Sequence, residues 1–200
     1  MAKHLNRRRL HYSKLSILSC VIAVVFSKPL LPYEMPFHAA LEYVGYFLVA
    51  ACVLGRVYCS AFIGGYKNAR LITYGPFSVT RNPLYLFSLI GVLGLALTSG
   101  HLLVAVVLLG VFALMYRFLI LREERFLLAQ LGPEYRAYME RTPRLIPKFS
   151  LYDCPDEITV RPQFIAKACL DAIWWFVAFP VFELIEYLQE AGIIPFLNGF

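Results

Sequence analysis

The chain has 200 residues, a length typical of a single domain. Hydrophobic residues make up 60% of it, charged residues make up only 16%, and the mean hydropathy is +0.63. Soluble domains are closer to half apolar and a quarter charged. The composition therefore excludes an ordinary soluble domain and indicates an integral membrane protein.

The formal net charge is +6, and the placement of the basic residues decides what this charge means. Most lysines and arginines lie in three short flanks of apolar segments, which is the positive-inside pattern rather than a nucleic-acid-binding surface. The flanks contain Lys3, Arg7, Arg8, Arg9 and Lys14, then Arg56, Lys67, Arg70 and Arg81, and finally Arg117, Arg122, Arg125, Arg136, Arg141, Arg144 and Lys148. We expect the N-terminus and all three flanks to face the cytoplasm, and we expect no nucleic-acid binding.

The cysteines and histidines form no recognisable ligand pattern. The five cysteines include no C-x-x-C pair, which argues against a disulfide or zinc framework. The four histidines are His4, His11, His38 and His101, and they are scattered without metal-ligand spacing. The sequence therefore predicts no metal site.

Four apolar runs are predicted to span the membrane. They cover about 10–32, 39–63, 82–98 and 101–121. The third run is shorter than the roughly 20 residues that a span usually needs. Only Ser99 and Gly100 separate the third run from the fourth, so the sequence predicts a tight antiparallel helical hairpin.

The segment after the fourth span, 122–148, is predicted to cap the cytoplasmic side. The helical pattern continues to Leu131, Gly132 breaks it, and Pro133 restarts a short helix that ends at Arg141.

These elements predict a membrane core at 1–148 and a separate C-terminal part at 149–200. The C-terminal part is a linker followed by an apolar run at 164–188, which either spans the membrane or lies at its interface as an amphipathic helix. The expected fold is all-α. It is a polytopic transmembrane helical bundle of four to five membrane helices, with a tight hairpin and a cytoplasmic cofactor pocket.

Arg81, Asn82, Pro83 and Tyr85 mark the start of the third predicted helix. Asn is a preferred N-cap and Pro is preferred at the first helical position. The free N–H groups of a helix start, together with the charge of Arg81, favour an anion such as a carboxylate or phosphate. On local grounds alone, a helix cap beside an interfacial arginine is the simpler interpretation.

Glu123 and Glu124 are adjacent carboxylates at the end of the fourth predicted span. Adjacent helix positions point about 100° apart, so one glutamate is expected to pair with Arg81, Arg122 or Arg125 and the other to meet a cationic ligand group. The hairpin brings this end next to the start of the third helix. One cation and two anions at a single membrane surface suit a zwitterionic ligand, although a structural ion-pair network explains the same residues.

Tyr135 and Tyr138 lie three positions apart and therefore on one face of the short helix that begins at Pro133. Together with 143–147, they either cover the gap between the two longer helices or anchor the short helix at the membrane interface.

The ordered set of these motifs resembles the isoprenylcysteine carboxyl methyltransferase family and is similar to the related phospholipid methyltransferases. The set runs from Thr73 to Lys148 as Gly-Pro-Phe, Arg-Asn-Pro-x-Tyr, a hairpin, Glu-Glu, Gly-Pro-x-Tyr-x-x-Tyr and Pro-x-x-Ile-Pro. Asn82 stands where the family motif has His, and the region after Lys148 matches nothing in the family.

The resemblance implies S-adenosylmethionine as the cofactor, bound at the cytoplasmic end of the hairpin. It implies a catalytic role for Arg81 and Glu124. The cofactor-binding residues that it implies are Asn82, Pro83, Tyr85, Glu123, Tyr135 and Tyr138. We expect Arg81 or a neighbouring arginine to orient a substrate carboxylate, and Glu123 or Glu124 to hold the cationic end of the cofactor.

The resemblance further implies a lipophilic or lipidated methyl acceptor that enters from the bilayer, with carboxyl O-methylation of an isoprenylcysteine-like group in first place. Three alternatives stay open: a phospholipid N-methyltransferase, an NADPH-dependent reductase resembling steroid reductases, and a non-catalytic membrane binding protein. The expected location is a bacterial inner membrane or, in a eukaryote, the endoplasmic reticulum.

Overall fold

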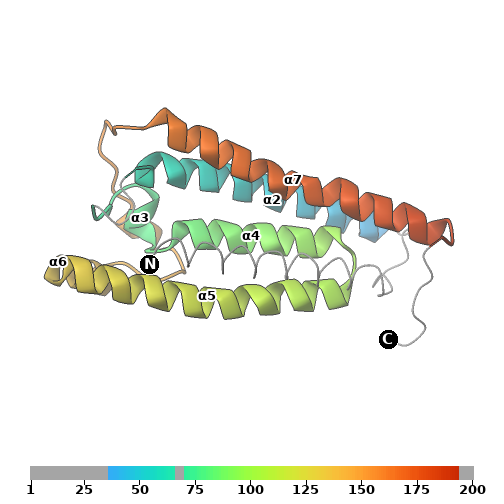
Figure 1. Ribbon diagram of the computed structural model, residues 1–200, viewed down its shortest axis with the longest axis horizontal. Helices are drawn as coiled ribbons and strands as arrows, with labels where there is room; N and C mark the ends of the chain where they lie inside the picture. Colours follow the sequence, from blue (N-terminus) through green and yellow to red (C-terminus); the bar gives the residue numbers. More distant parts are fainter. Residues whose placement is uncertain (1–35, 66–69, 194–200) are drawn as a thin grey trace. The chain divides into compact units, whose positions relative to one another are not determined.

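The computed structural model describes residues 36–65 and 70–193, which form helices joined by turns and linkers, with no strand among them (Figure 1). Three of these helices are long and apolar enough to cross a membrane: α2 (Pro36–Ile63), α5 (Leu102–Leu131) and α7 (Pro162–Glu190). The prediction of an all-α membrane protein is therefore confirmed. The first predicted span, 10–32, lies outside the described residues.

The predicted hairpin is present, and its first arm is short. This arm, α4 (Pro83–Thr98), has 16 residues, or about 24 Å at 1.5 Å per residue, less than the ~30 Å of a hydrocarbon core. Residues 99–101 then turn the chain back into α5 (Figure 1). Gly100 adopts a φ of 63°, a left-handed conformation that glycine reaches without a steric cost.

The break and restart after α5 also follow the sequence. The helix ends at Leu131, Gly132 turns the chain with a φ of 57°, and α6 (Pro133–Arg141) begins with a proline at its first position. Before α4, Gly75 and Pro76 lead into one short helical turn, α3 (Pro76–Val79). The linker before α7 contains a short 3₁₀ segment, η1 (Phe149–Leu151).

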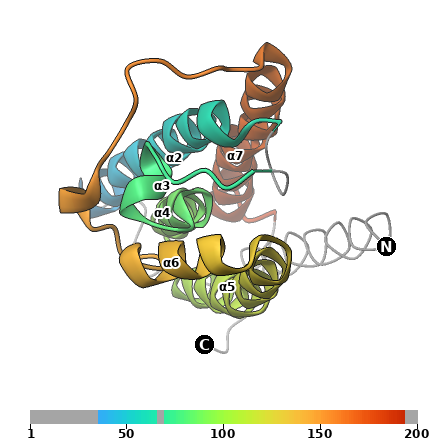
Figure 2. The ribbon, with the colours of Figure 1, turned by 90° about the vertical axis from the view of Figure 1, so that its left-hand side faces the viewer.

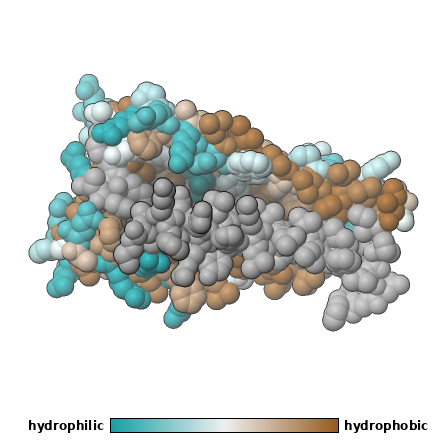
Figure 3. Space-filling model, viewed as in Figure 1, coloured by the Kyte–Doolittle hydropathy of each residue, from teal (hydrophilic) through white to brown (hydrophobic). Residues whose placement is uncertain are grey.

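The long helices expose large apolar side chains that water would not favour. On α5 these include Val106, Leu114 and Phe118, and on α7 they include Leu170 and Trp174. In the space-filling view, hydrophobic surface follows α5 and α7, whereas hydrophilic residues gather around α6 (Figure 3). Exposed apolar side chains on helices of this length are what contact with lipid requires, and they support integration into a membrane.

The chain divides into two compact units. The first comprises 1–48, 92–113 and 177–200. Within its described part, Val104 of α5 packs against Ile185 of α7, and Leu108 and Phe182 surround them. Tyr46 of α2 donates a 2.9 Å hydrogen bond to Glu183 of α7.

The second unit comprises 49–91 and 114–176. Its core contains Cys59 and Phe62 from the end of α2, with Ile72 and Phe77 from the connection that includes α3. Figure 2, which looks along the helices, shows α6 near the start of α4 and the end of α5. The eight candidate site residues all belong to this unit.

Candidate functional site

The start of α4 is held in place by the segment that follows α6. The helix begins at Pro83, and the backbone amides of Tyr85 and Leu86 both donate to the Asn82 carbonyl at 3.1 Å. The amide side chain of Asn82 donates to the carbonyl of Arg144 at 3.0 Å. Asn82 therefore stands at the predicted cap position, and its side chain also connects two parts of the site.

Residues 143–148 run alongside the strand-like stretch before α4. The Arg81 amide donates to the Pro143 carbonyl at 2.8 Å, and the Lys148 amide donates to the Val79 carbonyl at 2.9 Å. The Thr80 hydroxyl lies within 3.2 Å of the Arg144 carbonyl. These bonds fix the backbone of Arg81, and through it the direction in which its side chain can extend.

Glu124 of α5 is buried and paired with two arginines. Its Oε1 lies 3.2 Å from Nη1 of Arg81, and its Oε2 lies 2.9 Å from Nη2 of Arg144. Arg144 also directs its Nε at both carboxylate oxygens, and this hydrogen bonding to Glu124 raises the pKa of Arg144. The side chains of Arg81 and Glu124 are 9% and 6% exposed, whereas that of Arg144 is 46% exposed. The expected pairing of one glutamate with Arg81 is present, and Arg144 is a second partner that the sequence did not indicate.

The neighbouring Glu123 faces a different partner, as the 100° separation of adjacent helix positions requires. Its Oε2 accepts a 3.0 Å hydrogen bond from the hydroxyl of Tyr85, which also makes an edge-to-face contact with Tyr116. The two adjacent carboxylates thus have different partners: Glu124 forms ion pairs with two arginines, and Glu123 accepts a hydrogen bond from the Tyr85 hydroxyl beside the cavity.

Tyr135 and Tyr138 of α6 are both buried, at 3% and 6% exposure, and their rings lie 5.9 Å apart. The Tyr138 hydroxyl donates to the Phe77 carbonyl at 2.7 Å and so ties α6 to α3. Burial raises the pKa of Tyr135 to about 12 and also raises that of Tyr138, so both hydroxyls stay protonated further into the alkaline range than an ordinary tyrosine. Of the two predicted arrangements, these contacts fit a cover over the gap.

All eight predicted site residues line one small cavity of about 80 Å³. Its other walls are apolar, apart from Arg70. The additional lining residues are Ile63, Arg70, Leu71, Ile72, Phe77, Leu84, Leu127 and Leu131. The cavity thus combines two arginines and two glutamates with aromatic and aliphatic walls, a composition suited to a ligand with separated charges and an apolar part.

The guanidinium of Arg81 has unused hydrogen-bonding capacity. Its Nε is buried, and within 36–65 and 70–193 no group accepts a hydrogen bond from it; its Nη1 has only the ion-pair contact with Glu124. Buried N–H groups normally find an acceptor. An anionic group in the cavity would supply one.

Arg144 and Arg70 are the charged residues at this site that sequence reasoning missed. Arg144 is 20 residues from Glu124 along the chain, and Arg70 is not part of the recognised motif set. The Pro-x-x-Ile-Pro motif around Arg144 was the available signal, because it placed this segment near the cavity without specifying its side-chain contacts.

Comparison with known proteins gives one family and two named relatives. Residues 37–134 match the family model described as phospholipid methyltransferase. The cobalt-zinc-cadmium resistance protein CzcN of Cupriavidus metallidurans is 38% identical over 146 residues, which are 73% of this chain and 67% of that protein. The nickel-cobalt-cadmium resistance protein NccN of Alcaligenes xylosoxydans xylosoxydans is 32% identical over 157 residues, which are 78% of this chain and 73% of that protein. No solved structure gives a significant match.

Proposed function

Because the chain belongs to the phospholipid methyltransferase family, we propose that it transfers a methyl group from S-adenosylmethionine to a lipophilic acceptor at the membrane surface. The single observation that carries the proposal is the buried Arg81 guanidinium, whose Nε has no acceptor in the described part of the chain and which lines a cavity shared with Glu123. A zwitterionic cofactor offers an anion for the first group and a cation for the second.

The residues of the cavity fit the charges of S-adenosylmethionine. Arg81 would hold its carboxylate, and Glu123 its ammonium group. The rings of Tyr85 and Tyr135 offer faces that attract a cationic sulfonium. When bound, the cofactor supplies an electrophilic methyl group. The cavity of about 80 Å³ is smaller than the ~300 Å³ at the lower end of small-molecule sites, so we expect its walls to move apart on binding.

We assign Glu124 a positioning role rather than direct contact with the cofactor. Both of its oxygens already face guanidinium groups, from Arg81 and Arg144. A carboxylate occupied in this way holds Arg81 in the orientation that an anion needs. Glu123, which accepts a hydroxyl hydrogen bond from Tyr85, is the better candidate for a cationic group.

The protonation state of the cavity favours an acceptor that is already nucleophilic. Tyr135 is protonated at neutral pH, as an ordinary tyrosine is, and burial raises its pKa further to about 12, so its hydroxyl is no general base for an incoming ammonium group. A carboxylate needs no general base. We therefore rank carboxyl O-methylation of a prenylated or similarly lipophilic acid above N-methylation of a phospholipid amine.

The fixed lining of the cavity supports the same chemistry in another way. Tyr138 lines the cavity and donates its hydroxyl to the Phe77 carbonyl, and backbone hydrogen bonds join Pro143 to Arg81 and Lys148 to Val79. Methyl transfer is a displacement whose rate depends on alignment and desolvation, and effective molarities of oriented reactants reach about 10⁵ M or more. The arginines and tyrosines would act by orientation rather than by proton transfer.

The test begins with cofactor binding to the purified full chain in detergent, measured by calorimetry. We expect Arg81→Gln and Glu123→Gln to abolish or strongly weaken binding. Arg136→Gln is the matched control, because Arg136 is exposed on α6 and does not line the cavity. Absence of binding by the wild-type chain at millimolar cofactor would refute the proposal, and binding of NADPH instead would favour the reductase alternative.

The acceptor is tested with cofactor that carries a radiolabelled methyl group and with two lipid substrates, a prenylated cysteine and a phospholipid amine. A methyl ester releases its label as methanol in alkali, whereas an N-methyl group keeps it. Alkali-labile label on the prenylated cysteine is the expected result. Alkali-stable label on the phospholipid would move N-methylation to first place, and tight cofactor binding with no product from any lipid would favour a binding protein.

The names of the two relatives suggest a cellular process in which the proposed methyl transfer takes part. Both proteins are named for resistance to cobalt and cadmium, and we propose that methyl transfer by this chain contributes to tolerance of the same metals. A host strain without the gene should then grow less well on cobalt or cadmium. Restoration by the wild-type gene but not by Arg81→Gln would tie the phenotype to the cavity.

A further inference from the structure

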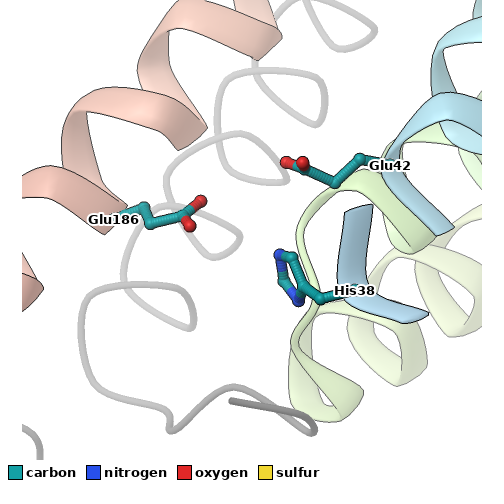
Figure 4. A group of neighbouring side chains, drawn as sticks. All are labelled: His38, Glu42 and Glu186. Carbon is teal, nitrogen blue, oxygen red and sulfur yellow. The ribbon is translucent and has the colours of Figure 1, made fainter. Parts of the chain in front are cut away.

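A second group of functional side chains lies in the unit that does not contain the Arg81 cavity. His38 and Glu42 come from the first two turns of α2, and Glu186 comes from the last turns of α7. Figure 4 shows the three side chains pointing toward one another. The closest ligand atoms, one from each residue, all lie within 4.8 Å of one another.

The charged side chains among the described residues of this unit are all acidic. Its described residues contain four carboxylates and neither a lysine nor an arginine. The carboxylates belong to Glu42, Glu183, Glu186 and Glu190. Ionisable groups in membrane helices are costly and mark functional sites. Two partly buried carboxylates that converge beside an imidazole call for a cation to offset their repulsion.

Packing that does not depend on a ligand holds the His38 ring and joins the two helices that carry the three side chains. The His38 ring lies against Gly100, where an added Cβ would come within 2.6 Å of its Cε1, so the hairpin turn fixes one side of the imidazole. The hydrogen bond from Tyr46 to Glu183 joins α2 to α7 one turn before Glu186. The ring of Tyr46 also meets that of Phe179 edge to face at 4.6 Å. The ligand atoms therefore approach one another on helices that are already joined.

We propose that His38, Glu42 and Glu186 bind a divalent transition-metal ion of the zinc, cobalt and nickel class. One imidazole and two carboxylates form a mixed nitrogen and oxygen set, which suits these ions better than the oxygen-only sites of magnesium or calcium. Ligand atoms about 2.1 Å from a tetrahedral ion lie about 3.4 Å apart. From separations of at most 4.8 Å, small side-chain rotations complete the site, with water filling the remaining position.

The sequence alone did not indicate this site, although His38 and Glu42 have the i, i+4 spacing that puts two ligands on one helix face. The third ligand is far away along the chain, on α7. The site is also independent of the proposed methyl transfer, because none of its residues lines the cavity at Arg81. Failure of one proposal would leave the other intact.

The experiment measures zinc bound to the full chain in detergent after equilibrium dialysis, with metal analysis of the protein and an initial chelator wash. The wild-type chain should bind a single ion. Glu42→Gln, Glu186→Gln and His38→Gln should each weaken binding at least about 10-fold. Glu190→Gln is the matched control, since it removes an exposed carboxylate one turn further along α7 and should leave binding unchanged.

A second measurement separates lost ligands from lost folding. Zinc that binds the native state raises the thermal midpoint of the wild-type chain, and this rise should disappear in Glu186→Gln while the S-adenosylmethionine affinity stays at the wild-type value. No zinc bound to the wild-type chain would overturn the proposal. Equal weakening by Glu190→Gln and Glu186→Gln would also overturn it, because it would indicate non-specific attraction to acidic residues.

Discussion

The two ion pairs of Glu124 differ in burial and in contact geometry, so their coupling energies show which of the two factors is more important. Its carboxylate meets Arg81 through one 3.2 Å ion pair and Arg144 through a bidentate arrangement with a closest approach of 2.9 Å. Geometry alone ranks the pair with Arg144 as the stronger one. Exposure reverses that ranking, because the Arg81 side chain is 9% exposed and that of Arg144 is 46% exposed.

The magnitudes follow from the local dielectric. At an effective dielectric constant of about 20, unit charges 3.2 Å apart attract by about 5 kcal/mol before desolvation is counted, and removing one partner of a buried pair costs about 3–5 kcal/mol. Ion pairs with a partly exposed member contribute about 0–1 kcal/mol. We therefore predict coupling energies of about 3 kcal/mol for Glu124 with Arg81 and about 1 kcal/mol for Glu124 with Arg144.

Two double-mutant cycles measure these couplings separately. The variants are Glu124→Gln, Arg81→Gln, Arg144→Gln and the two doubles that contain Glu124→Gln, each unfolded by denaturant in detergent. Glu123→Gln serves as a control because it removes a neighbouring carboxylate without touching either ion pair. A coupling with Arg144 that equals or exceeds the coupling with Arg81 would refute the reasoning from burial.

Three further predictions concern stability. Gly132→Ala should lower the free energy of unfolding by about 1 kcal/mol, because the φ of 57° at this position is unfavourable for alanine. Gly110→Ala lies in open space within α5 and should raise the free energy of unfolding by up to about 1 kcal/mol. Equal shifts of the thermal midpoint in the two variants would contradict this prediction. Tyr138→Phe should cost about 1–2 kcal/mol by leaving the buried Phe77 carbonyl without its 2.7 Å hydrogen bond, and a thermal midpoint like that of the wild type would show the bond to be dispensable. Burial raises the pKa of Tyr135 from 10.0 to about 12, so stability should hold up to about pH 10 and fall toward pH 12, since the unfolded chain loses that proton first. Tyr135→Phe should reduce this loss of stability at alkaline pH, and an unchanged dependence of stability on pH would show that the Tyr135 hydroxyl does not cause it.

The elements of the fold could be predicted from the sequence because their signals are local. Pro83 and Pro133 mark helix starts, Gly100 and Gly132 supply left-handed turns, and long apolar runs define α2, α5 and α7. Each rule acts within a turn or two of the chain, where covalent geometry and solvation restrict the choices. The approach of Arg81 to Glu123 and Tyr135 could also be predicted, because the hairpin and the order of the motifs bring these segments to the same end of the two helices.

Side-chain pairing could not be predicted in the same way. Glu124 had three candidate arginines nearby, and the sequence does not rank them, because an ion pair depends on the backbone path of distant segments. Only the hydrogen bonds that place 143–148 beside Arg81 decide that Arg144 becomes the second partner. The same limit hid Glu186, whose approach to His38 depends on the packing of α7 against α2.

The sequence by itself therefore determined that the protein lies in a membrane, where its helices begin and end, and which residues meet at one cavity. The tertiary structure decided which arginines pair with Glu124, and that Glu186 approaches His38 and Glu42 in the other unit. The physical reason is one of range. Helix propensity, capping and transfer into lipid act on neighbouring residues, whereas ion pairing and metal ligation depend on side-chain positions that only the packed chain defines.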